Sequence, residues 1–344
     1  GQFVNAADPQ QFANGLKGAL DSIVARTASS SNLGVSSAQL RQGGRVYQAR
    51  YTSEVWTGDI VSFLVGSDGE ISTTPEWRAS DQVPAPASRN IYTRNGSTAV
   101  PFVWNQLSDA QKAALGNNSA VLDYLRGVRS GESSEGGSFR NRSSLIGDIV
   151  HSSPIYVAEP DDFAYERFSG SWPGADTYQT HRTLRKDRTP MLYAAANDGL
   201  LHGFVASTGV ERFAYVPSSS LAQMYQLTRP SYTHQFIHDG ALTVADVYDA
   251  GTASAWRTLL VGSTGRGGRQ LYALDVSDPT IPTDNPAGRR VMWEFSDADF
   301  GRFTGKPVVG RMNNGDWAVL VGNGYNSNEY NGFLFVVNAT TGEL

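Results

Sequence analysis

The side chains of this sequence that could carry chemistry are few, and the closest set is Asp148, His151 and Ser152. A carboxylate, an imidazole and a hydroxyl are the groups of an acyl-transfer triad. These three lie within one short segment that reads as extended, so their side chains cannot converge as orienter, base and nucleophile. We therefore predict a structural role, with Asp148 and His151 bonding backbone groups.

Metal and cofactor motifs are also incomplete. We predict that His234 and His238 form a rim or a core pair rather than a metal site. The chain has no cysteine, which removes thiolate catalysis, Cys-ligated zinc and disulfide bonds. Asp297 and Asp299 have the spacing of a calcium loop but lack its third oxygen ligand and terminal Glu. We expect no metal, no cofactor and no catalytic residue in this chain, which predicts a protein that is not an enzyme.

Phosphate and nucleic-acid sites are disfavoured as well. Residues 301–306 have too short a glycine spacing for a phosphate loop, and Pro307 stands where a Ser or Thr would hold magnesium. The glycines of residues 262–268 lie between two predicted strands, so they indicate a hairpin turn. A net charge of -5 without a dense basic stretch argues against nucleic acid as a partner. No apolar run is long enough for a transmembrane helix.

The elements that position these residues begin with an N-terminal helix and linker, predicted for residues 1–30. Strands follow in residues 31–144, together with a helical insert whose first helix begins at a capping box formed by Ser108 and Gln111. We expect this part to pack on the remainder of the chain. Residues 130–144, rich in Gly, Ser and Glu, predict a mobile loop. We place a boundary near residue 145.

From residue 145 to residue 344 the chain repeats itself. A similar strand sequence begins at Leu201, Leu271 and Leu334, each time after another strand and a Gly-rich turn. Each unit also has an earlier strand, and the first two units have a later one. The repeated stretches are residues 201–209, 271–278 and 334–342. The strands predicted around them are residues 153–157, 191–195 and 211–215, then 240–244, 257–261 and 291–295, then 305–309 and 317–321.

Four-stranded units of this kind cannot bury both faces alone, so they stack around an axis. We therefore predict an all-β dominated chain. Its fold is a partial or modified β-propeller of four-stranded blades, with a small helical insert and an N-terminal helix. The last blade is incomplete, which leads us to expect that the sequence stops in the middle of a blade. The repeat is longer than the usual ~40 to 45 residues of a blade, so residues 165–188 and 221–234 are predicted insertions.

The motifs of this region resemble the PilY1/PilC family of type IV pilus assembly and adhesion proteins. The similar stretches are residues 145–154, 197–199, 255–258, 265–269 and 271–276, with residues 56–59 and 139–142 upstream. The resemblance implies an exported protein of a Gram-negative bacterium, in the periplasm, on the outer membrane surface or at the pilus tip. It implies a non-catalytic module that promotes pilus biogenesis and surface or host attachment. The resemblance also implies a calcium loop in a later blade of the family pattern, and the sequence given contains no such loop.

The alternative is a fragment of a quinone-cofactor (PQQ-type) dehydrogenase, since that propeller class has a similar blade repeat. Such an enzyme needs carboxylates that hold calcium and an aromatic floor under the quinone. Only Asp246, Asp249 and Trp256 are candidates for these roles, and we favour a packing role for them.

Loops at the ends of a propeller carry variable binding chemistry on a rigid frame. The stretch from Phe163 to Trp172 is rich in aromatic residues, so we predict a partner-binding surface there. Its residues are Tyr165, Phe168, Trp172 and Tyr178. The alternative is that these rings cover the helical insert. The expected partners are minor pilins or other pilus components, or host surface or matrix proteins, and the sequence leaves an adhesin and a purely structural platform equally open.

Overall fold

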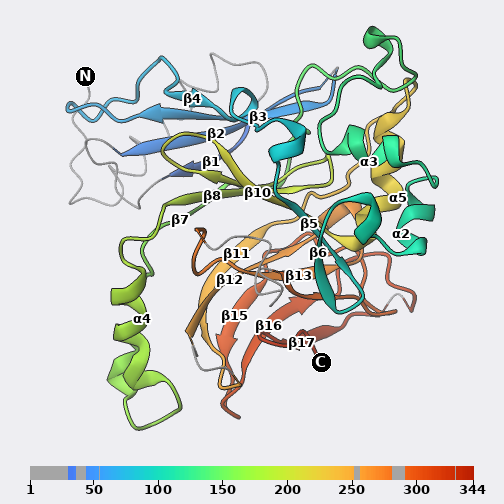
Figure 1. The fold of residues 1–344 in the computed structure, drawn as a ribbon. Helices are drawn as coiled ribbons and strands as arrows, with labels where there is room; N and C mark the ends of the chain where they lie inside the picture. The colour runs from blue at the N-terminus through green and yellow to red at the C-terminus, as the bar shows by residue number, and fades with distance from the viewer. Residues whose placement is uncertain (1–29, 36–43, 54, 252–255, 281–290, 330) are drawn as a thin grey trace.

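The fold is known from a computed structural model that describes residues 30–35, 44–53, 55–251, 256–280, 291–329 and 331–344 (Figure 1). The predicted N-terminal helix lies outside these residues. The described chain forms four β-sheets, antiparallel except for one parallel strand pair, with a few short helices. The prediction of an all-β dominated fold is confirmed.

Sheet 1 is a four-stranded sheet that the sequence did not reveal as a unit. It contains β1 (Ser30–Val35), β2 (Arg45–Thr52), β3 (Thr57–Leu64) and β4 (Trp77–Arg78) in that order. Strands were expected within residues 31–144, but β1 and β4 were not foreseen, and the region was expected only to pack on the repeats. The sheet has the meander order of a complete blade.

Sheet 2 has six strands and joins two distant parts of the chain. Its blade consists of β7 (Ile155–Val157), β8 (Met191–Ala195), β9 (Leu201–Val205) and β10 (Glu211–Val216). The hairpin of β5 (Ile91–Asn95) and β6 (Thr98–Pro101) extends the outer edge, where β5 pairs with β10 in parallel. The predicted boundary near residue 145 stays a prediction, and this sheet contains strands from both sides of it.

Sheets 3 and 4 complete the described fold. Sheet 3 contains β11 (Leu242–Tyr248), β12 (Trp256–Ser263), β13 (Leu271–Asp275) and β14 (Val291–Phe295). Sheet 4 contains β15 (Val308–Arg311), β16 (Trp317–Gly322) and β17 (Leu334–Asn338). The strands predicted for the three repeat units are present, and within the described residues sheet 4 has three strands.

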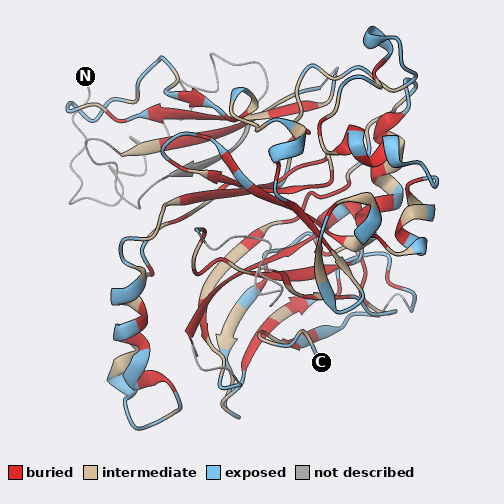
Figure 2. Cartoon of the chain, viewed as in Figure 1, coloured by how far each residue is buried: buried red, intermediate tan, exposed pale blue. Residues whose placement is uncertain are grey.

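The sheets follow one another around an axis. The first strand of each sheet contacts the first strand of the next, from β1 to β7, β11 and β15. Alternate residues of a strand point to opposite faces, so Leu192 packs toward sheet 1 while Tyr193 packs toward sheet 3. In sheet 3, Leu260 faces sheet 2 and Leu259 faces sheet 4. Each inner sheet therefore buries both faces, as Figure 2 shows, and the predicted partial propeller is confirmed.

Helices cover the outer end of sheet 2. They are α2 (Asp109–Ala114), α3 (Ser119–Leu125) and α5 (Leu221–Met224). The capping box of Ser108 and Gln111 at the start of α2 is confirmed. Apolar side chains of the three helices pack on Ile91 and Ala214 of the sheet. Single turns of 3₁₀ helix are η1 (Ala79–Asp81), η2 (Pro86–Ser88), η3 (Trp104–Gln106), η4 (Ser133–Glu135), η7 (Ser218–Ser220), η8 (Tyr225–Thr228) and η9 (Gly265–Gly267).

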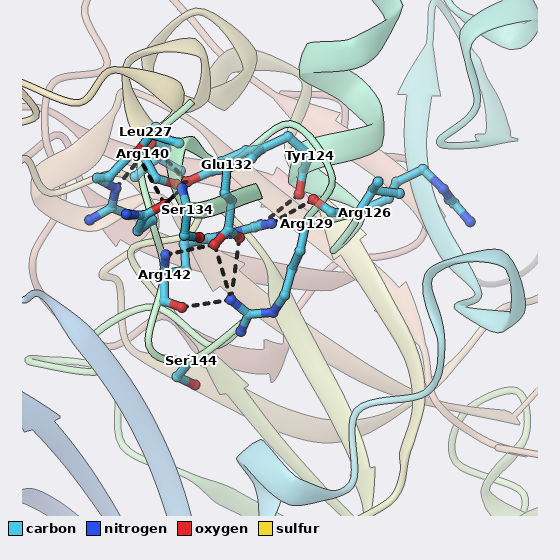
Figure 3. Close-up of polar contacts among 12 residues, drawn as sticks. Tyr124, Arg126, Arg129, Glu132, Ser134, Arg140, Arg142, Ser144 and Leu227 are labelled. Atoms are coloured by element: carbon cyan, nitrogen blue, oxygen red, sulfur yellow. Dashed lines mark hydrogen bonds and ion pairs between the residues drawn. The ribbon is translucent and has the colours of Figure 1, made fainter. Parts of the chain in front are cut away.

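Residues 130–144 are anchored, so the prediction of a mobile loop is wrong. Glu132 is 2% exposed, and its carboxylate accepts hydrogen bonds from Nε of Arg142 at 2.9 Å and Nη1 of Arg129 at 3.2 Å (Figure 3). The Arg142 guanidinium also stacks over the ring of Tyr124 and donates to the carbonyls of Tyr124 and Val128. A buried carboxylate must be paired, and this pairing holds the loop.

Backbone segments approach each other closely where one blade leads into the next. A Cβ atom on Gly147 would lie 2.2 Å from the backbone nitrogen of Asp198, in the β8–β9 turn. A Cβ atom on Gly301 would lie 2.3 Å from the carbonyl oxygen of Tyr325, in the β16–β17 connection. Glycine is therefore required at corresponding places in two blades.

A buried ion network fixes the outer strands of sheet 2. Both ring nitrogens of His202 face carboxylates, Nδ1 at 2.7 Å from Glu211 and Nε2 at 3.0 Å from Asp198. Glu211 also receives two hydrogen bonds from Arg89, which lies two residues before the start of β5. Since carboxylates only accept, both imidazole nitrogens must donate, and His202 is an imidazolium. The network joins β9, β10 and the segment leading into β5.

The pKa values of this network follow from those contacts. Burial would lower the pKa of His202, but Asp198 and Glu211 outweigh it and raise that pKa to about 9. Burial would raise the pKa of Glu211, but Arg89 and His202 lower it to about 2. The ion pairs therefore form without a net charge being left in the core.

Replacing Gly147 by Ala tests the close approach of the backbones. The added Cβ atom must displace the β8–β9 turn, so we expect the free energy of unfolding to fall by about 2 kcal/mol. Gly310→Ala is the matched control, because no atom lies within 4 Å of its Cβ position. Urea denaturation measures both changes, and equal stability of the two variants would contradict the interpretation.

Replacing His202 by Gln tests the ion network. A raised pKa stabilises the fold fully below the usual value of 6.5, and this stabilisation disappears as the pH rises through about 9. We expect the loss in unfolding free energy, relative to the native chain, to be on the order of 3 kcal/mol near pH 6. The loss should be much smaller near pH 10. Urea denaturation at both pH values is the measurement, and a loss independent of pH would refute the charged state of His202.

Candidate functional site

The connection between β7 and β8, residues 158–190, contains the predicted binding residues. We call it the β7–β8 insert. It contains η5 (Tyr165–Phe168), η6 (Ala175–Thr177) and α4 (Tyr178–Arg185). Figure 1 shows it projecting at the lower left, on the opposite side of the molecule from α2, α3 and α5.

The inner side of the insert is a cluster of aromatic rings. Tyr178 is fully buried, and its ring lies 4.6 Å from that of Trp256 at the start of β12. Tyr165 stacks on Trp256 with an interplanar angle of 10° and contacts Trp317 at the start of β16. Trp172 packs against the same tryptophans. An insert that leaves sheet 2 thus covers the ends of sheets 3 and 4.

Asp246 of β11 is the polar centre beneath the insert. This carboxylate is 3% exposed and accepts a hydrogen bond of 2.6 Å from the Thr258 hydroxyl. The Tyr178 hydroxyl lies 2.9 Å from Oδ2 of Asp246 and 2.7 Å from the carbonyl of Asp161. Burial would raise the pKa of Asp246, but its hydrogen bonds outweigh burial and lower that pKa. The carboxylate is therefore a charged anchor for the insert.

Further polar contacts fasten both ends of the insert. The indole nitrogen of Trp256 donates to the carbonyl of Gly174 at 2.9 Å. A Cβ atom on Gly174 would lie 2.1 Å from the ring of Tyr248. Arg185 pairs with Asp278 at 2.9 Å. These contacts hold the insert as a rigid part of the propeller rather than as a loose loop.

The outer side of the insert presents apolar side chains to solvent. The exposed fractions are 43% for Phe163, 52% for Phe168 and 75% for Leu184. Phe163 stacks on Tyr165 at 5.4 Å, and Tyr165 in turn stacks on Trp256. The exposed ring thus ends a stack that begins in the buried core. An aromatic ring held in this way loses little conformational entropy on binding.

The backbone next to Phe163 is held in an unusual conformation. Ala164 has a φ of 53°, the left-handed region that non-glycine residues rarely adopt. The Asp162 carboxylate accepts a hydrogen bond from the Ala164 backbone at 2.9 Å and pairs with Arg182 of α4 at 3.2 Å. Strain of this kind persists where the surroundings impose it and is concentrated at functional sites.

The structure separates the predicted binding residues into two groups. Tyr165, Trp172 and Tyr178 form the aromatic base, while Phe168 is exposed. The alternative that these rings cover the helical insert is wrong, because α2 and α3 pack on a different cluster. A partner-binding role for the four residues stays a prediction. Leu184 was missed, since a single Leu among the basic residues of α4 gives no signal.

The residues of the suspected triad have separate partners. The Asp148 carboxylate accepts hydrogen bonds of 2.8 Å from the Asn197 amide and from His234. Nδ1 of His151 lies 2.6 Å from Asp239, and the Ser152 hydroxyl accepts from the Ala195 backbone. The prediction that Asp148 and His151 bond backbone groups is corrected, because the side chains of both pair with other side chains. Their structural role is as expected.

The remaining candidates are also engaged in structural contacts. His234 stacks on Trp56 at 3.7 Å, whereas His238 is buried with Nε2 at 2.8 Å from the Tyr272 hydroxyl. Asp249 pairs with Arg257 at 3.1 Å, and Asp246 and Trp256 belong to the base of the insert. This is the packing role favoured over a quinone site.

The acidic and glycine-rich motifs give turns. Asp297 accepts a hydrogen bond from the Asp299 backbone, which closes a turn. Residues 301–306 lead into strand β15 instead of a helix. The described residues contain no group of three or more His, Asp or Glu side chains placed to hold a metal ion. Within the described residues we also find no helix with the length and apolar character needed to cross a membrane.

Comparison with known proteins identifies related chains. Residues 146–342 match the family described as the PilY1 beta-propeller domain. A type IV pilus biogenesis factor PilY1 homolog of Xylella fastidiosa is 38% identical over 99% of this chain and 27% of its own length. Type IV pilus biogenesis factor PilY1 of Pseudomonas aeruginosa is 33% identical over 100% of this chain and 31% of its own length. The chain thus spans less than a third of these two curated relatives.

A solved structure is also similar in sequence. The crystal structure of the Pseudomonas aeruginosa PilY1 C-terminal domain shares 35% identity with this chain. The alignment covers 55% of this chain and 35% of that chain, with a TM-score of 0.43.

Replacing Tyr178 by Phe tests how the insert is held. The change removes the hydroxyl next to Asp246, and a hydrogen bond to a charged group contributes about 1.5 to 3 kcal/mol. We expect the insert to open more often, so that trypsin cleaves after Arg182, Arg185 or Lys186 roughly tenfold faster. Limited proteolysis with mass spectrometry measures the rates. Thr180→Ala, an exposed change on the same helix, is the control, and equal rates for the two variants would contradict this role of Asp246.

Proposed function

Because the chain belongs to the PilY1 β-propeller domain family, whose relatives are type IV pilus biogenesis factors, we propose that it acts as a non-catalytic binding and assembly module in pilus biogenesis. The observation that carries this proposal is the β7–β8 insert. It presents Phe163 and Phe168 on a buried aromatic base that spans sheets 3 and 4. Exposed aromatic anchors on a rigid support are typical of binding hot spots.

The described chemistry supports binding more than catalysis. The imidazoles of His151, His202 and His234 are each paired with carboxylates. The three side chains that resemble a triad, those of Asp148, His151 and Ser152, each form hydrogen bonds with different partners. The β7–β8 insert instead exposes the apolar side chains of Phe163, Phe168 and Leu184, and exposed apolar surfaces mark contacts with other proteins.

The proposed partners are minor pilins or other pilus components. An exported protein in the cell envelope, at the outer membrane surface or the pilus tip, is the setting in which these partners would be met. Attachment to a host surface or to matrix proteins is a second use of the same insert. Calcium binding belongs, in this proposal, to other parts of the longer proteins that the family includes.

The test is the double change Phe163→Ser and Phe168→Ser in the full-length protein. We expect the affinity for the pilus partner to fall at least tenfold, because each exposed ring contributes about 1 to 2 kcal/mol as an anchor. Surface pili should become fewer. Pull-down with minor pilins and electron microscopy of the cells are the measurements.

Tyr325→Ser is the matched control, since Tyr325 is another exposed aromatic residue, at 45% exposure, outside the insert. Pull-down with matrix proteins distinguishes attachment from assembly. If the double variant binds pilins and assembles pili as the native protein does, the insert is not the assembly surface.

A further inference from the structure

The ends of the strands opposite the β7–β8 insert carry a second surface. Antiparallel strands place the β7–β8 and β11–β12 connections at one end of the blades. The β2–β3 and β12–β13 turns and the segments leading into β7 and β11 lie at the other end. Side chains from all four of these places meet there. They are Trp56, Arg140, His151, His234, Phe236 and Arg266, which we call the aromatic–basic strip.

The strip is continuous through ring contacts. Trp56 stacks on His234, with ring centroids 3.7 Å apart. His234 meets Phe236 edge to face at 5.0 Å, and Phe236 contacts His151 at 5.4 Å. The Arg266 guanidinium lies over the Phe236 ring at 5.4 Å. Residues far apart in sequence thus form one surface across sheets 1, 2 and 3.

Arg140 extends the strip beside Trp56. Its Nη1 atom donates to the carbonyl of Val55, and its Nε atom donates to the carbonyl of Leu227 (Figure 3). The guanidinium lies 4.5 Å from the centre of the Tyr232 ring. Arg140 is therefore fixed in place by backbone carbonyls, while no carboxylate neutralises it in these contacts. Its charge remains available to a partner.

Buried carboxylates orient both imidazoles of the strip. His151 has a side chain that is 41% exposed and is held by Asp239, whose side chain is 1% exposed. His234 is held by Asp148, whose side chain is 2% exposed. Each carboxylate lies beneath the surface, and the second nitrogen of each ring is left for other contacts. The strip therefore combines aromatic rings with the imidazole nitrogens and the guanidinium groups of Arg140 and Arg266.

Trp56 is held with backbone strain. Its φ is 51°, a left-handed conformation that an aromatic residue rarely adopts. This conformation places the indole on His234 and leaves the preceding Val55 47% exposed. The surroundings thus impose a costly backbone geometry that presents one tryptophan between Arg140 and His234.

We propose that the aromatic–basic strip binds an acidic protein segment that carries an aromatic side chain. Tryptophan and arginine are the residues most enriched in the energetic centres of protein interfaces. The chain as a whole has a net charge of -5. The strip differs from this average, because its carboxylates are buried while its arginines are not paired with them. This arrangement favours an acidic partner. The segment's aromatic ring would pack against Trp56 and Phe236, and its carboxylates would pair with Arg140 and Arg266.

This surface is independent of the β7–β8 insert. It lies at the other end of the strands. On the insert, Phe163 and Phe168 are accompanied by exposed side chains of both charges, among them Asp161, Asp162 and Arg167. The two surfaces therefore suit different partners, and failure of either proposal leaves the other standing.

Binding of synthetic peptides tests the proposal. A labelled peptide that alternates Glu and Phe is titrated with the 344-residue chain, and its affinity is compared with those of a Lys and Phe peptide and a Glu and Ala peptide. We expect the Glu and Phe peptide to bind most tightly, and the Lys and Phe peptide not to bind. Fluorescence anisotropy at low and moderate salt gives the dissociation constants, which should rise with salt.

Two variants locate the binding. Arg266→Glu reverses an exposed charge, and Trp56→Ala removes the indole ring at the other end of the strip. We expect each to raise the dissociation constant at least about tenfold. Arg167→Glu, an exposed arginine of the insert, is the matched control and should leave it unchanged. Because Arg266 is exposed, its variant remains informative even if Trp56→Ala fails to fold.

Four results would overturn the proposal. They are equal binding of the Lys and Phe peptide, no binding of the acidic aromatic peptide, unchanged affinity in the Arg266→Glu variant, and tighter binding of heparin than of the peptide through the same residues. The last would assign the strip to an acidic polysaccharide. Sedimentation of the chain alone also tests the identity of the partner, because self-association abolished by Arg266→Glu would show that a second copy occupies the strip.

Discussion

The fold depends on burying both faces of each inner sheet between two neighbours. Leu192 and Tyr193, or Leu259 and Leu260, are consecutive residues that belong to different cores. Strand alternation makes this possible, and it means that no inner sheet is stable without the sheets on either side. Glycines such as Gly147 allow the backbones of adjacent segments to approach closely enough for that packing. The packed sheets form a rigid frame that supports the loops at both ends of the strands.

The repeated part of the fold could be predicted because its constraint is local. Each strand of sheets 2, 3 and 4 has its own alternation, and each blade repeats the same order of strands and turns. Sheet 1 has no such sequence repeat, and its β4 consists only of Trp77 and Arg78, so no pattern shows it to be a blade. The anchored loop around Glu132 was also beyond prediction, because its Gly and Ser content resembles that of a flexible segment while one buried carboxylate decides its structure.

The same limit applies to the candidate site. The aromatic richness of the β7–β8 insert is visible in the sequence, but which rings face the core depends on residues of other blades. Tyr178 is buried because Asp246 and Trp256 lie beneath it. Phe168 is exposed although it lies only three positions after Tyr165. The aromatic–basic strip was harder to foresee still, since Trp56, His151, Phe236 and Arg266 come from four separate connections.

The antiparallel order of the blades explains why the two surfaces differ. Connections between the first and second strands lie at one end, and those between the second and third strands lie at the other, so a chain can vary them separately. The insert at the first end places aromatic rings over Asp246, which the Tyr178 hydroxyl contacts. At the second end, Asp148 and Asp239 are buried beneath imidazoles, and Arg140 and Arg266 supply the positive charge. A rigid frame that carries two different surfaces at opposite ends of its strands can hold two partners at a fixed separation, which is a physical requirement of an assembly module.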